Sequence, residues 1–355
     1  ALPTSSLNTT SPWTWRVVLP VLVLIALTAA VSAPLYYHRL LEPTFDDYDA
    51  HVVFTLRLLK GDLPPTFVLA HPVLQLILGF LYWAGRGRVD IYAAAAFVQV
   101  AAQVATALVL YFWIGPLSGR WGQVKRAAAA LSLTLVAPIM LLAPLDGRFY
   151  FGYIGLANYH NPTIHLLRPF ALLSFIFVVR AFTYARSPAW QVALSAALML
   201  GGALVKPSFA ISILPVLALA AAWSLWRERP IDWKMLLWGL AAPAVAALIL
   251  QIAVVYLLPD ADPSGITLAP FAVEAAFSDY LPLKFLLSIT FPLLASVVFW
   301  RRLRSDLSLQ LAWLAFLSGA LQLYLLAETG ERFYHGNFRW SAQITLFLLF
   351  AAAAR

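Results

Sequence analysis

The chain has 355 residues, of which 62% are hydrophobic and only 11% are charged, and its formal net charge is +8. Soluble domains are about 45–50% apolar and about 25% charged, so this composition excludes an ordinary soluble protein and predicts a polytopic membrane protein. Cysteine is absent, which excludes a disulfide framework, a thiolate nucleophile and a Cys-ligated metal. The basic residues are scattered through short loops, so nucleic acid is not an expected partner.

The first apolar run has flanks that resemble those of a signal peptide. Arg16 precedes it, and the small residues of Val31-Ser32-Ala33 resemble a cleavage site. The run from Val17 to Tyr37 is nevertheless long enough to cross a bilayer. We therefore interpret it as an uncleaved first helix.

A membrane-spanning helix needs roughly 20 apolar residues, and the chain contains about ten runs that approach this length. The sequence therefore predicts an all-α bundle, with residues 1–355 forming one transmembrane domain and no soluble C-terminal domain. The expected spans cover residues 15–37, 90–115, 127–145, 164–183, 189–205, 207–226, 234–258, 283–300, 307–326 and 340–354.

A further short apolar run, Val68–Trp83, decides which loops share a side of the membrane. Basic loops favour the cytoplasm, and all of them fall on that side only if this run does not cross. We therefore expect Val68–Trp83 to be a juxtamembrane helix on the outer face. The basic loops contain Arg16; Lys125 and Arg126; Arg186; Arg227, Arg229 and Lys234; and Arg301, Arg302 and Arg304.

On this topology the polar loops 38–89, 146–163, 259–282 and 327–339 all face away from the cytoplasm. The first of them holds an acidic cluster of Asp46, Asp47 and Asp49 beside His51. A carboxylate at a membrane surface needs water, a cation, a metal or a substrate proton as its partner. Capping of a helix that begins here explains the first two carboxylates but not the whole group, so we expect a functional role.

Two further outer segments each allow a structural and a functional interpretation. One segment lies around the start of a span and contains His160, Asn161, His165 and Arg168. It forms either a helix cap with a snorkelling arginine or a site that binds an anion. Lys206 stands at a break between two spans, where it either snorkels or contacts a phosphate.

The last outer loop carries Arg332 and Arg339, and paired arginines suit a phosphate or pyrophosphate. The side chains of Asp49, His51 and His71 could hold a divalent cation, although their spacing specifies none. No motif of a common soluble enzyme, such as a Walker loop or HExxH, is present, so the chemistries of those enzymes lack support. No cofactor is certain from sequence, apart from the divalent metal that these side chains could hold.

Residues 44–116 resemble the GT-C superfamily of membrane glycosyltransferases, in particular the branch that uses lipid-phosphate sugars. That branch includes protein O-mannosyltransferases and the aminoarabinose transferases of lipid A. The matching pieces are Phe45-Asp46-Asp47, Gly61-Asp62, His71-Pro72 and the non-crossing run Val68–Trp83.

The resemblance implies a GT-C-like bundle in which Asp46 or Asp47 is the catalytic base. It further implies a polyprenyl-phosphate sugar as donor, membrane lipids as surroundings, and an inverting transfer at the non-cytoplasmic face. The acceptor would be a glycan, a lipid or a protein of the cell envelope, and the location the inner membrane of a bacterium. From the residues, Lys206, Arg168, Arg332, Arg339, His160 and Asn161 are the candidates for binding the lipid phosphate.

Two alternatives belong to other classes: a transporter or flippase of lipid-linked sugars, and a non-catalytic assembly subunit with the same fold. A transporter would place charged residues at the midplane of several spans. The expected span interiors hold few ionisable residues, which favours the transferase.

Overall fold

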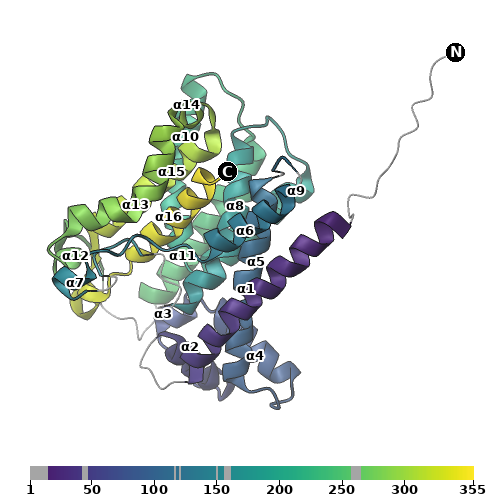
Figure 1. The fold of residues 1–355 in the computed structure, drawn as a ribbon. Coiled ribbons are helices and arrows are strands. Elements are labelled where there is room, and N and C mark those ends of the chain that lie inside the picture. The colour runs from purple at the N-terminus through teal and green to yellow at the C-terminus, as the bar shows by residue number, and fades with distance from the viewer. Residues whose placement is uncertain are drawn as a thin grey trace.

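The computed structural model describes residues 15–41, 47–115, 117–119, 121–148, 151–155, 161–256 and 265–355. These residues are mostly helical, and seven of their helices are long and apolar enough to cross a membrane. The chain is therefore an integral membrane protein, as its composition predicts. Figure 1 shows the helices gathered into one bundle.

The helices of the first half are α1 (Trp15–Leu41), α2 (Asp47–Leu59), α3 (Thr66–Leu69), α4 (Val73–Ala84), α5 (Ile91–Ile114), α6 (Gly122–Thr134), α7 (Ala143–Asp146), α8 (Pro162–Ala181), α9 (Ala189–Val205) and α10 (Ser208–Trp226). The second half contains the π-helix η1 (Met235–Ala241), α11 (Ala242–Tyr256), β1 (Ile266–Leu268), α12 (Ala272–Ala275), α13 (Leu281–Val298), α14 (Trp300–Ser305), α15 (Leu307–Leu325), β2 (Leu326–Glu328), the 3₁₀ helix η2 (Gly330–His335) and α16 (Arg339–Ala353).

The seven candidate spans lie in α1, α5, α8, α10, η1 with α11, α13 and α15. The three other spans expected from sequence do not correspond to helices long enough to be counted as candidate spans. The apolar helix α9 has 17 residues, and α16 has 15 residues that are almost all buried by neighbouring helices. The span expected over 127–145 is not one helix, because α6 ends at Thr134 and residues 136–142 are not helical.

A proline explains the end of α6. In a continuing helix the backbone N–H of residue 138 would donate to the Thr134 carbonyl, but residue 138 is Pro138 and has no N–H. The guanidinium of Arg168, from α8, donates to the Thr134 carbonyl instead, at 3.4 Å. The expected span over 127–145 was wrong because it was based on hydropathy alone, which does not register the break at Pro138.

The run Val68–Trp83 forms the end of α3 and most of α4, with a break at His71 and Pro72. Helix α4 has 12 residues and rises about 18 Å, well short of the ~30 Å hydrocarbon core. Its length therefore suits a helix that does not cross. Helices α2, α3 and α4 lie together at one end of the bundle, which we call the α2 end (Figure 1).

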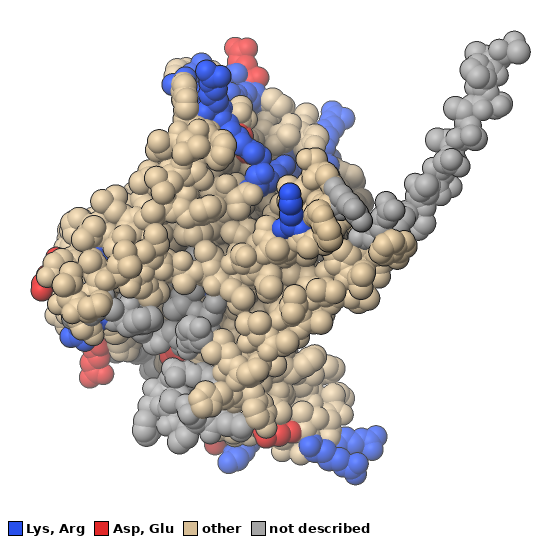
Figure 2. Space-filling model, in the orientation of Figure 1, with Lys and Arg blue, Asp and Glu red and all other residues tan. Residues whose placement is uncertain are grey.

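The opposite end, which we call the α14 end, carries the basic helix α14 (Figure 1). In Figure 2, Lys and Arg side chains gather near this end. An antiparallel pair of short strands, β1 and β2, joins segments that are far apart in the chain and was not expected from sequence.

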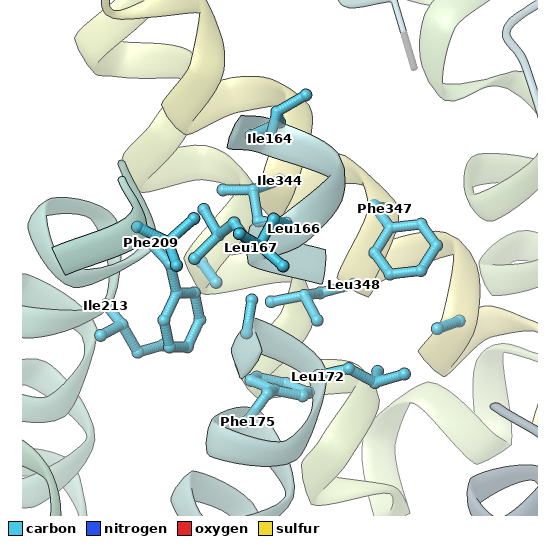
Figure 3. Packing of buried hydrophobic residues seen from close by; sticks show 14 of the residues in the cluster. Ile164, Leu166, Leu167, Leu172, Phe175, Phe209, Ile213, Ile344, Phe347 and Leu348 are labelled. Atoms are coloured by element: carbon cyan, nitrogen blue, oxygen red, sulfur yellow. The ribbon is translucent and has the colours of Figure 1, made fainter. Parts of the chain in front are cut away.

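One part of the interior lies where α8, α10 and α16 meet. Leu167 and Phe175 of α8, Phe209 of α10 and Phe347 of α16 are at most 3% exposed, and Figure 3 shows them packed together. This packing buries α16 on nearly every side although the helix is short.

Replacement of Gly319 by valine is expected to separate α15 from α16 and to destabilise the bundle by roughly 1–3 kcal/mol. A Cβ at Gly319 would lie 2.6 Å from the Ser341 carbonyl oxygen of α16, so the two backbones approach too closely for any side chain. Gly79 of α4 is the matched control, since its Cβ would meet only Leu59 at 3.8 Å. Thermal unfolding in detergent checks this, and equal losses for Gly319→Val and Gly79→Val would contradict the close approach.

Candidate functional site

The site begins with Asp47, the first residue of α2. His51 lies four residues later on the same face of the helix, and the face is completed by Thr55, whose hydroxyl donates to the His51 carbonyl at 2.9 Å. His51 and Thr55 are buried, whereas Asp47 is partly exposed. The helix therefore presents one carboxylate at its end and an imidazole one turn deeper. Asp46, the other expected base, lies outside the described residues.

Asn161 connects Asp47 to the start of α8. Its side-chain oxygen accepts hydrogen bonds from the backbone N–H groups of Thr163, at 3.0 Å, and Ile164, at 3.3 Å, as a helix cap. Its amide nitrogen donates to the Asp47 carboxylate at 2.6 Å. The cap interpretation of Asn161 is thus confirmed, and the same amide also orients Asp47; its role in binding an anion stays a prediction. His160 lies outside the described residues.

Lys206 enters the same site from the break between α9 and α10. Its backbone is extended, with φ −165°, and Pro207 follows, so Lys206 belongs to neither helix. The side chain is only 8% exposed, and its ammonium donates to the Thr163 hydroxyl at 3.3 Å. It also lies 4.8 Å from the centre of the Trp340 ring. Burial lowers the pKa of Lys206 to about 8, and attraction to the Asp47 carboxylate limits the drop.

Two histidines complete the site, of which His51 is buried and His71 is partly exposed. His51 Nδ1 accepts from the side-chain amide of Gln75 at 2.5 Å, which assigns the proton of the neutral ring to Nε2. His71 Nδ1 is buried and has no hydrogen-bond partner within the described segments. Burial first, and then the charge of Lys206, lowers the pKa of His51 to about 4 and that of His71 to about 3. Both rings are therefore neutral at pH 7.

A second polar group adjoins the site through Tyr48, the neighbour of Asp47. His165 Nδ1 is 2.9 Å from the Tyr36 hydroxyl and 3.1 Å from the Tyr48 hydroxyl, and Gln103 donates to Tyr36 at 2.6 Å. These contacts join α8 to α1, α2 and α5 and fix Tyr48, the neighbour of Asp47. Sequence analysis named His165 but not its tyrosine partners, because no local pattern marks a tyrosine that bonds a residue 129 positions away.

The expected arginines are not gathered at Lys206. Arg168 donates to the Thr134 carbonyl and lies 5.1 Å from the Phe347 ring centre, inside the bundle. Arg332 pairs with Glu328 at 3.1 Å, although its charge still acts on His71. Arg339 pairs with buried Glu274 at 2.7 Å. Each of the two arginines thus has its own carboxylate, and their joint binding of a phosphate stays a prediction.

The expected metal group is not assembled either. Asp49 lies two positions before His51 and therefore on another face of α2, where it accepts from the Tyr92 hydroxyl at 3.2 Å. Across the part of the chain that the structure describes, no three His, Asp or Glu side chains are placed to hold a metal ion. His51 and His71 remain near Lys206, whose positive charge opposes a cation there.

Sequence analysis also missed a buried lysine. Lys284, in the first turn of α13, is fully buried and donates to the Phe151 carbonyl at 2.8 Å. A charged residue close to the start of an apolar span was the available signal.

No protein family, curated protein or solved structure matches this chain. The functional conclusion therefore depends on the geometry of Asp47, Asn161, Lys206 and the two histidines.

Proposed function

We propose that this chain is a membrane-embedded glycosyltransferase that moves a sugar from a polyprenyl-phosphate donor to an acceptor hydroxyl at the α2 end. The observation that carries the proposal is the convergence of Asp47 and Lys206, brought together by Asn161 and Thr163. One group can accept a proton, the other can hold an anion, and both lie at the end of an apolar bundle.

The carboxylate of Asp47 would act as general base. It would take the proton of the acceptor hydroxyl as that oxygen forms a bond to the anomeric carbon of the sugar. The bond between the anomeric carbon and the donor phosphate oxygen breaks on the opposite face, so the configuration inverts. The hydrogen bond from Asn161 holds the carboxylate in one orientation, which matters because transfer requires alignment of both oxygens with the carbon.

The leaving group is a polyprenyl phosphate, which carries its own negative charge. Lys206 would stabilise that charge, since its bond to Thr163 uses one of three N–H donors and the buried surroundings strengthen the attraction. The unmatched His71 nitrogen can exchange a hydrogen bond with a phosphate or sugar oxygen. Arg332 would add longer-range positive charge.

The transporter remains the alternative, and the buried polar groups of α8 are the observation that favours it. Among the charged ones, Arg168 is the deepest. It lies six residues after the start of α8, which corresponds to about 9 Å along the helix. The midplane of a bilayer is about 15 Å from either boundary of the hydrocarbon core. The charged groups of α8 are thus too shallow for an ion path through the membrane, which favours the transferase over the transporter.

Reconstitution of the full chain in vesicles tests the proposal. The vesicles contain polyprenyl-phosphate glucose, mannose or arabinofuranose together with a membrane lipid extract as acceptor, and mass spectrometry follows release of polyprenyl phosphate. We expect release from one donor. Absence of both release and binding of polyprenyl phosphate would overturn the transferase and favour a non-catalytic subunit. Movement of the intact donor between leaflets would favour the transporter.

The affinity for polyprenyl phosphate is expected to fall as the pH rises through about 8. Only protonated Lys206 attracts the anion, and its lowered pKa places the loss about two units below that of an ordinary lysine. His51 and His71 stay neutral above about pH 5, so they add no step near neutrality. Binding of polyprenyl monophosphate measured between about pH 6.5 and about 9.5 checks this.

Lys206→Arg is the matched control for that measurement. An arginine stays charged throughout the range, so the variant should bind with no decline near pH 8. An equal decline in the variant would assign the titration to another group.

A further inference from the structure

Two adjoining hollows lie at the α14 end, away from the site at the α2 end. One is a groove of about 420 Å³ between α5 and α8, lined by apolar side chains that include Phe112, Trp113 and Ile176. The other, of about 370 Å³, is lined by polar side chains that include Arg302 and Ser308. They share Val179 and Arg355, so an apolar channel between two candidate spans continues into a basic pocket.

Trp113 supplies a donor inside the apolar groove. Its ring stacks on Phe175 with centroids 5.7 Å apart and planes at 14°, which fixes the direction of the indole N–H. That N–H is buried and meets no acceptor among the residues with described positions. A buried donor without an acceptor costs roughly 1–3 kcal/mol of stability. An oxygen atom of a ligand that accepts the Trp113 N–H would remove this cost.

The basic pocket favours an anion. Arg302 donates to the Arg355 carbonyl at 2.7 Å, and Arg355 donates to the Ser308 hydroxyl at 3.4 Å, so both guanidinium groups face one space. The acid there, Asp306, lies 3.9 Å from Arg302, and its other oxygen caps α15 through the backbone N–H of Ser308 at 2.9 Å. Two guanidinium side chains therefore face this pocket together with one side-chain carboxylate, Asp306, which already has partners.

We propose that these hollows bind one anionic glycerophospholipid of the surrounding membrane. The phosphate lies against Arg302 and Arg355, an ester carbonyl accepts the Trp113 N–H, and an acyl chain fills the groove between α5 and α8. The order of these groups along the lipid matches the order of cation, donor and apolar surface in the protein. The inference is independent of the proposed function, because this site is at the other end of the bundle.

The test compares dioleoyl phosphatidylglycerol with dioleoyl phosphatidylcholine on the delipidated full chain in detergent, by native mass spectrometry. We expect phosphatidylglycerol to bind more tightly. Arg302→Gln should weaken its binding about fivefold, which corresponds to the attraction of one basic side chain for an anionic lipid. Trp113→Phe keeps the ring, removes the N–H and should weaken binding by about three- to tenfold.

Arg304→Gln is the matched control, because Arg304 belongs to the same helix but lies over the Trp300 ring at 4.1 Å. It should bind phosphatidylglycerol like the unmodified chain. Equal affinity for the two lipids, or equal weakening by Arg304→Gln and Arg302→Gln, would overturn the proposal. Weakening by Arg302→Gln with no effect of Trp113→Phe would overturn the placement of the ester at Trp113.

Discussion

Asp47→Asn is expected to lower the rate of sugar transfer by about 10²–10⁴-fold while leaving the bundle folded, because general base catalysis typically contributes that factor. Asparagine has the shape of aspartate and can still accept the Asn161 hydrogen bond, but it cannot take a proton. The measurement is release of polyprenyl phosphate in vesicles, with thermal unfolding as the check on folding.

Asp49→Asn is the matched control on the same helix. Its carboxylate accepts from Tyr92 on another face, so the variant should retain transfer within a few-fold. Asp46→Asn completes the set, since the sequence allows either residue of the pair as the base. Full activity in both Asp46→Asn and Asp47→Asn would end the assignment of the base to this pair.

Arg339→Met is expected to destabilise the protein by about 3–5 kcal/mol, because it leaves Glu274 buried without a counter-charge. Both nitrogens of the guanidinium that contact Glu274 donate to the same oxygen, at 2.7 and 3.2 Å. The second oxygen of Glu274 is buried without a hydrogen-bond partner in the described segments, so the carboxylate depends heavily on this arginine.

The double variant Glu274→Leu with Arg339→Met should recover most of that loss, since removing both charges removes the uncompensated one. Arg304→Met at the exposed α14 helix is the control and should change stability by less than about 0.5 kcal/mol. Unfolding in mixed micelles measures all three variants. If Arg339→Met had unchanged stability but lost sugar transfer, Arg339 would be assigned to substrate binding and not to a structural ion pair.

The residues tested by Asp47→Asn and Arg339→Met differ in how well their roles could be predicted from sequence. From sequence, Arg332 and Arg339 were expected to act together because they are seven positions apart in one polar loop. In the structure each has a glutamate partner, one in β2 and one in α12. Proximity along the chain was a poor guide because the partner of Arg339 is 65 residues away.

The sequence by itself determined the features that consecutive residues control. Its hydropathy predicted a helical membrane protein, the acidic cluster predicted the start of α2, and Lys206-Pro207 predicted a break. A helix cap was one of the two interpretations of the segment around Asn161, and the structure contains it. Each depends on hydrogen bonding or burial within a few residues.

Only the tertiary structure decided which of these polar groups meet. Asp47 and Asn161 are 114 positions apart, and Lys206 joins them through Thr163 from 43 positions away. The tertiary structure also places Asp47, Asn161 and Lys206 in one site and gives Asp49, Arg168 and Arg339 other partners. The physical reason is that a buried charge or amide takes whichever partner the packed helices bring within about 3 Å, and local sequence does not encode that packing.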